Sequence, residues 1–145
     1  MLTRTARTTQ PRAEVTMRLV GHGIDIVEVG RIRDLLATSR EDFEPAWFTS
    51  VEQEAARQHP DPAAFYARRH AAKEAVLKAL GTGLTQDIAP IDVEIQAQES
   101  GAPVVVLSGG ALAVAKQLGI RRWLLSISDT EHLAIASALA LQDDS

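Results

Sequence analysis

The spacing of apolar residues changes along this chain, and the first changes predict a strand followed by a helix. Residues 19–27 alternate like a strand but are interrupted by two glycines. The alternation places Asp25 on the same face as Gly21 and Gly23, so this carboxylate has two neighbours without side chains. Apolar residues then recur at helical spacing over 28–37, which predicts a helix there.

The middle of the chain predicts a connection and then two helices. Residues 38–45 are expected to be irregular, and Thr49 or Ser50 is expected to cap a short helix. A His-Pro-Asp-Pro segment ends that helix, and an apolar stripe predicts a longer one over 62–80. The sequence Gly-Thr-Gly follows directly and should stop this long helix.

The last third predicts a hairpin, a short helix and a final pair of strands. These elements are expected at 91–95 with 103–107, at 110–118, and at 123–128 with 132–139. Neither a repeat nor a linker is evident in the sequence. We therefore predict one α+β domain in which a mostly antiparallel sheet packs on the long helix. Its expected limits are 19–140, between a flexible N-terminal extension (1–18) and a polar tail (141–145).

Composition excludes several classes of protein. The 145 residues match one domain, and the absence of cysteine excludes a disulfide scaffold, a thiolate metal site and a cysteine nucleophile. A net charge of -4 with only 4% aromatic residues argues against a nucleic-acid partner. No apolar run approaches the roughly 20 residues of a membrane span. With no secretory signal in the sequence, we expect a cytoplasmic protein.

Two segments carry candidate chemistry, and each has a simpler interpretation. Asp25 beside bare glycines suits a hard cation such as magnesium, but it could instead cap the following helix. His70, Glu74 and Lys78 share one stripe of the long helix, and Arg69 lies on an adjacent stripe with Lys73. Such residues could hold a metal among phosphate-binding cations, or form an ordinary solvated helix face.

Two further features are weaker. The Gly-Thr-Gly segment offers backbone N–H groups and a hydroxyl to a phosphate, or is simply a glycine helix terminus. The four histidines lack the spacing of a zinc motif. Ser126, Ser128, Asp129 and His132 could be assembled into a catalytic triad, but the sequence has no Gly-x-Ser-x-Gly nucleophile elbow.

Taken together and in order, these segments resemble the holo-(acyl-carrier-protein) synthases, a family of small 4′-phosphopantetheinyl transferases. The resemblance covers roughly residues 19–140. It rests on Gly-His-Gly-Ile-Asp-Ile (21–26) with Arg-Ile (31–32), Phe-Thr-Ser-Val-Glu (48–52), Arg-His-Ala-Ala-Lys-Glu-Ala-Val-Leu-Lys-Ala-Leu-Gly-Thr-Gly (69–83), Ile-Asp-Val-Glu-Ile (91–95) with Gly101 and Pro103, and Ser-Ile-Ser (126–128).

The resemblance implies a fold, an assembly and a reaction. The fold would be that of the 4′-phosphopantetheinyl transferases, assembled as a homotrimer with an active site between neighbouring subunits. Coenzyme A would donate its phosphopantetheine arm to a serine of an apo acyl carrier protein. Adenosine 3′,5′-bisphosphate would be released, and magnesium would be the metal.

The resemblance also assigns residues. Asp25 and Glu74 would bind Mg²⁺, and Lys78 would lie near the phosphates. Glu74 is the first candidate for the base that takes the serine proton, directly or through water, and Asp25 is the second. Arg31 would grip the acidic carrier protein. The positions assigned to coenzyme A are Arg69, Gly81, Thr82, Gly83, Pro103 and Ser128.

The chain departs from the family pattern at a few positions. Asp129 replaces the histidine of a Ser-x-Ser-His segment, and a carboxylate there would repel phosphate. Ala102 replaces a lysine, and His70 stands where the family has an aromatic residue. These departures suggest a paralogue tuned to a carrier protein of fatty-acid or polyketide synthesis. They also keep two alternatives open: a protein that binds a carrier protein or an acyl-coenzyme A without transfer, and a purely structural protein.

Overall fold

The elements follow one another in the order of an α+β domain. The structure is a computed structural model, and it describes residues 11, 14, 16–82 and 87–143. The elements are β1 (Met17–Glu28), α1 (Val29–Trp47), α2 (Ser50–Arg57), α3 (Pro62–Leu80), the 3-10 turn η1 (Pro90–Asp92), β2 (Val93–Ala97), β3 (Pro103–Leu107), α4 (Gly109–Gln117), β4 (Arg122–Asp129) and β5 (Leu133–Asp143).

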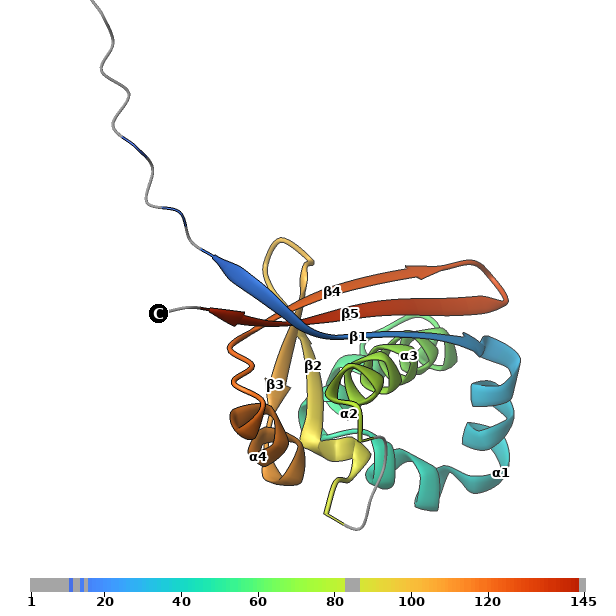
Figure 1. Ribbon diagram of the computed structural model, residues 1–145. Coiled ribbons are helices and arrows are strands. Elements are labelled where there is room, and N and C mark those ends of the chain that lie inside the picture. The colour runs from blue at the N-terminus through green and yellow to red at the C-terminus, as the bar shows by residue number, and fades with distance from the viewer. Residues whose placement is uncertain (1–10, 12–13, 15, 83–86, 144–145) are drawn as a thin grey trace, which may run out of the picture.

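Antiparallel pairing organises the strands into two sheets. The larger has the order β1-β5-β4, and both outer strands pair antiparallel with β5. The smaller is the β2-β3 hairpin. Figure 1 shows α3 lying along one face of the larger sheet, with the β2-β3 hairpin and α4 beside α3 on the same side of that sheet. The predicted α+β class, with a mostly antiparallel sheet on a long helix, is confirmed.

Residues without side chains, or with small ones, let α3 approach the sheet closely. A Cβ atom at Gly21 would lie 2.0 Å from the carbonyl oxygen of Ala79, and one at Gly23 would lie 1.9 Å from that of Ala75. The backbone of α3 therefore packs directly against the strand face that carries Gly21, Gly23 and Asp25. The neighbouring strand continues this flat surface with buried alanines at 134, 136, 138 and 140.

The boundaries of α2 and α3, the helices on either side of the His-Pro-Asp-Pro segment, were predicted correctly. Thr49 is the N-cap of α2, where its side chain and that of Glu52 form a capping box. The long helix occupies the predicted range 62–80 and ends at Gly81, whose φ of 79° favours glycine. No helix in the described part of the chain is long and apolar enough to cross a membrane.

Three expected boundaries were wrong. The strand expected at 91–95 is β2 at 93–97, because Ile91 and Asp92 lie in the 3-10 turn η1. Residues 38–45 are helical, because α1 continues through a kink at Ser39 and buries Phe43 in the core. Strand β5 extends to Asp143, and the buried Leu141 pairs with both Leu19 and Arg122. Residues 141–143 thus belong to the sheet rather than to a polar tail, because β1 continues to provide partners for Gln142 and Asp143.

Candidate functional site

Two carboxylates and a lysine meet where β1 packs on α3. The Nζ atom of Lys78 donates to Oδ1 of Asp25 at 3.0 Å and to the carbonyl oxygen of Ile24 at 2.9 Å. Glu74 lies one helical turn before this lysine. Burial, followed by the nearby negative charge of Asp25, raises the pKa of Glu74, while Lys78 and Arg31 oppose that rise.

This arrangement favours the metal-binding interpretation of Asp25 over the capping one. The N-cap of α1 is Glu28, and its side chain makes no capping hydrogen bond. Asp25 and Glu74 supply the oxygen ligands that Mg²⁺ prefers, and Mg²⁺ commonly completes its shell with phosphates and water. Among the described residues, no group of three or more His, Cys, Asp or Glu side chains could hold a metal. Two carboxylates would leave the remaining positions around such a cation to other ligands.

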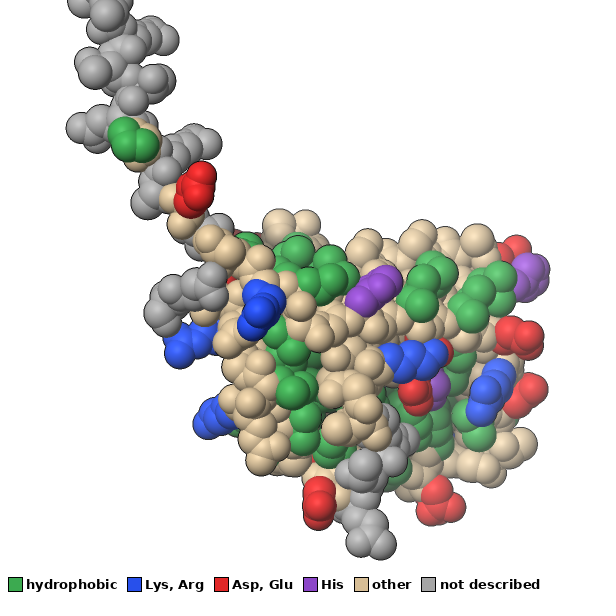
Figure 2. Space-filling model, viewed as in Figure 1, with side chains coloured by type: hydrophobic (Ala, Val, Ile, Leu, Met, Phe, Trp, Pro, Cys, Tyr) green, Lys and Arg blue, Asp and Glu red, His purple; other side chains and the backbone are tan. Residues whose placement is uncertain are grey.

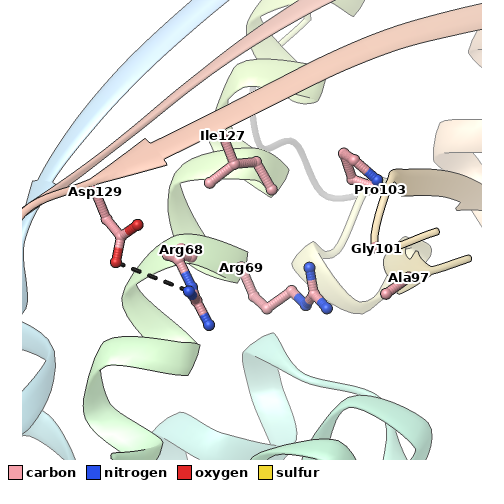
Figure 3. Close-up of a pocket in the computed structure, with 7 residues that line it drawn as sticks. All are labelled: Arg68, Arg69, Ala97, Gly101, Pro103, Ile127 and Asp129. Carbon is pink, nitrogen blue, oxygen red and sulfur yellow. Dashed lines mark ion pairs between the residues drawn. The ribbon is translucent and has the colours of Figure 1, made fainter. Parts of the chain in front are cut away.

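A pocket lies between α3, the β2-β3 turn and the end of β4 (Figure 3). Its volume is about 310 Å³, and its lining includes two arginines and one carboxylate. The lining residues are Arg68, Arg69, Ala97, Gly101, Pro103, Ile127 and Asp129. Two guanidinium groups around a cavity suit an anionic ligand such as a phosphate.

Arg69 is the arginine of this pocket that still needs an acceptor. Its guanidinium carbon lies 4.8 Å from the centre of the Phe65 ring. Its Nε atom is buried without a hydrogen-bond partner among the described residues. Burial lowers the pKa of Arg69. The negative charge of Glu52 opposes this fall, and the positive charge of Arg68 adds to it. An anion in the pocket would relieve both the unpaired donor and the desolvated charge.

Asp129, which replaces a histidine of the family pattern, faces the same pocket, but a cation of the same chain compensates its charge. Its Oδ2 atom lies 3.8 Å from Nη1 of Arg68 (Figure 3). The repulsion expected between this aspartate and a phosphate is therefore opposed by a neighbouring cation.

Lys73 is not available to a phosphate. Its side chain is 0% exposed, and its Nζ atom donates to Oε1 of Glu52 at 2.7 Å and to the carbonyl oxygen of Val93. The other oxygen of Glu52 accepts from the backbone N–H of Ile95 at 3.1 Å. This buried ion pair ties α2 and α3 to β2, so Lys73 serves the fold.

His70 occupies an aromatic site. Its ring stacks on Trp47 with centroids 4.2 Å apart, and Phe43 lies nearby. Burial lowers the pKa of His70 to about 4, so the ring is neutral at pH 7. This packing explains how a histidine replaces the aromatic residue of the family pattern.

The other predicted positions are spread over the chain. Gly81 and Thr82 follow the end of α3, about 18 Å along the helix axis from Arg69, and Gly83 lies outside the described residues. Ser128 alternates with the pocket-lining Ile127 and Asp129, which places it on the opposite face of β4. Arg31 is exposed on α1, where it lines a second cavity of about 540 Å³.

Comparison with known proteins identifies the family. The model of the 4′-phosphopantetheinyl transferase superfamily matches residues 21–136. The chain belongs to this superfamily. It is 43% identical to the holo-[acyl-carrier-protein] synthase of Hydrogenovibrio crunogenus over 122 residues, which are 84% of this chain and 96% of that relative. The family predicted from the ordered motifs is confirmed.

Solved structures of phosphopantetheinyl transferases share the fold. An acyl carrier protein synthase of Plasmodium yoelii with ADP bound superposes with a TM-score of 0.79 at 33% identity, covering 88% of this chain and 98% of its own. The holo-(acyl-carrier-protein) synthase of Bacillus anthracis, in complex with coenzyme A (3′,5′-ADP), gives 0.72 at 30% identity, covering 88% and 99%. The predicted transferase fold is confirmed.

Sequence reasoning missed Arg68 and the role of Gly101 in the pocket. The signal for Arg68 was its position beside Arg69, but only the strand register shows that Asp129 points toward it. Within one chain, the structure thus brings together three of the predicted site residues, Asp25, Glu74 and Lys78. Separately, it brings Arg69 and Pro103 to the pocket.

Proposed function

We propose that this chain transfers the 4′-phosphopantetheine arm of coenzyme A to a serine of an apo acyl carrier protein. The observation that carries the proposal is the junction of Asp25, Glu74 and Lys78 at the β1-α3 contact, in a chain of this superfamily. We expect a cytoplasmic location, with which the cysteine-free composition is compatible, and carriers of fatty-acid or polyketide synthesis are the expected partners.

The reaction forms a bond between the serine oxygen and the phosphorus that carries pantetheine. The bond from that phosphorus to the bridging oxygen breaks, and adenosine 3′,5′-bisphosphate leaves. Glu74 accepts the serine proton, and Asp25 is the second candidate for this role. Burial and the nearby charge of Asp25 raise the pKa of Glu74, which makes it a stronger base than an ordinary carboxylate.

Charge at the pyrophosphate needs compensation during this transfer. Asp25 and Glu74 would hold a magnesium ion. When bound, this ion would neutralise part of the negative charge of the pyrophosphate. Lys78 is already fixed beside Asp25 by two hydrogen bonds, so its ammonium group can bind phosphate oxygens without much reordering. Arg31, exposed on α1, is left to bind the acidic surface of the carrier protein.

We further propose a homotrimer built through the outer face of the larger sheet. This face exposes a cluster of large apolar side chains, and Figure 2 shows hydrophobic groups at the surface over these strands. They include Ile24 (53% exposed), Ile26 (60%), Leu124 (50%), Leu133 (39%) and Ile135 (37%). Such a patch is typical of an interface. A site shared between subunits would also account for the separation of Gly81, Thr82 and Ser128 from the pocket of their own chain.

Substitution of the carboxylates tests the proposal. We expect Asp25→Ala and Glu74→Ala to reduce transfer to an apo carrier protein by about a hundredfold or more, because each removes a group acting on the reacting phosphate. Glu41→Ala, an exposed change on α1, is the matched control. Full turnover by either site variant would contradict the assignment. Carrier binding without transfer by the unaltered chain would support the binding-protein alternative.

Sedimentation equilibrium tests the assembly. The unaltered chain should sediment as a trimer, and Ile26→Lys should shift it toward monomer and reduce transfer, because a charge would be buried at the interface. A monomeric, fully active protein would rule out a site that needs two subunits.

A further inference from the structure

The pocket presents a problem of charge. Asp129 places a carboxylate in a cavity whose other charged residues suit an anion. A phosphate entering beside an uncompensated carboxylate would be repelled. The two arginines of the pocket are held differently, and this difference indicates how the repulsion is avoided.

Arg68 is fixed on two sides. Its Nη1 atom lies 3.8 Å from Oδ2 of Asp129, and its Nη2 atom donates to Nε2 of His59 at 3.2 Å. Because arginine only donates hydrogen bonds, Nε2 of His59 is the acceptor of this contact. Nδ1 of the same ring lies 3.0 Å from the backbone N of Asp61 and 2.9 Å from its carbonyl oxygen, so the ring is itself held in place. Arg68 is thus positioned before any ligand arrives.

Arg69 has no such partners. Its guanidinium lies against the Phe65 ring, and its Nε is buried without an acceptor among the described residues. Figure 3 shows the two side chains diverging, with Arg68 toward Asp129 and Arg69 toward the turn that carries Gly101. One arginine therefore balances the carboxylate, and the other is left for the ligand.

We infer that Arg68 is a positioning residue for the phosphate-bearing nucleotide end of coenzyme A, which acts by neutralising Asp129. This inference rests on the proposed function, since that function supplies the ligand. With the Arg68–Asp129 pair intact, the pocket offers the positive charge of Arg69, which Asp129 no longer opposes. With Arg68 lost, Asp129 opposes the same phosphate.

Titration calorimetry of the full chain with coenzyme A, and separately with adenosine 3′,5′-bisphosphate, tests this coupling. The variants are Arg68→Gln, Asp129→Asn and the double variant, and Arg57→Gln is a control for loss of one exposed positive charge on α2. Arg68→Gln should weaken binding of both ligands about tenfold. Asp129→Asn should bind at least as tightly as the unaltered chain, and the double variant should recover affinity to within about threefold of Asp129→Asn.

The recovery separates positioning from direct contact. Equal weakening in Arg68→Gln and in the double variant would mean that Arg68 contacts the ligand itself, and would overturn the inference. So would unchanged affinity in Arg68→Gln. Failure of the unaltered chain to bind coenzyme A would instead overturn the proposed function, and with it the inference.

Discussion

Replacing Lys73 by methionine should destabilise the fold rather than weaken ligand binding. The substitution keeps the length of the side chain but removes the charge that pairs with Glu52, whose side chain is 0% exposed. Removing one partner of a buried ion pair typically costs about 3–5 kcal/mol, because the other charge remains buried. Glu52 keeps two backbone N–H donors, from Thr49 and Ile95, so we expect the lower end of that range, about 3 kcal/mol.

That loss is a large part of a typical domain stability of about 5–15 kcal/mol. It should appear in urea unfolding followed by circular dichroism at one fixed protein concentration, since assembly would make the midpoint concentration-dependent. Replacing both partners, in Lys73→Met with Glu52→Gln, should recover part of the loss, since no unpaired charge remains buried. A loss below about 1 kcal/mol in Lys73→Met, together with weaker coenzyme A binding, would refute the structural role of this lysine.

Further predictions concern the strand–helix contact and pH. Gly23→Ala should cost about 3 kcal/mol or more in urea unfolding, because its Cβ would lie 1.9 Å from the Ala75 carbonyl oxygen. Gly30→Ala, with open space around its Cβ, should be neutral or stabilising by up to about 1 kcal/mol, and equal losses in both would contradict the close contact. The lowered pKa of His70, about 4, means that the unfolded chain binds more protons between pH 6.5 and 4, so stability falls as pH falls. His70→Phe preserves the stacking on Trp47 but cannot titrate. Between pH 7 and 5, its free energy of unfolding should fall by about 2 kcal/mol less than that of the unaltered chain. An identical fall in both proteins would contradict the buried neutral ring.

The parts of the fold that local chemistry determines were predicted from the sequence. The capping box at Thr49 and the glycine after Leu80 fixed the limits of α2 and α3, because caps satisfy backbone groups within a few residues. The end of β5 was missed, because Asp143 is polar and its place in the sheet depends on partners far away in the chain.

The site shows the same division. Strand alternation placed Asp25 on the glycine face of its strand, whereas its pairing with Glu74 was expected from the family resemblance. Helical spacing placed Lys73 near the phosphate-binding candidates, but its burial depends on Glu52 of another helix and could not be read from spacing. The pairing of Arg68 with Asp129 likewise needed the position of β4 relative to α3.

Intact-mass spectrometry of an apo acyl carrier protein tests the central claim most directly. The carrier is incubated with this chain, coenzyme A and magnesium, and a parallel sample contains a chelator. The proposed function predicts a mass gain of one phosphopantetheine arm on the carrier, and none in the chelated sample or with Glu74→Ala. An unchanged carrier mass in every sample, with several different carriers, would contradict it.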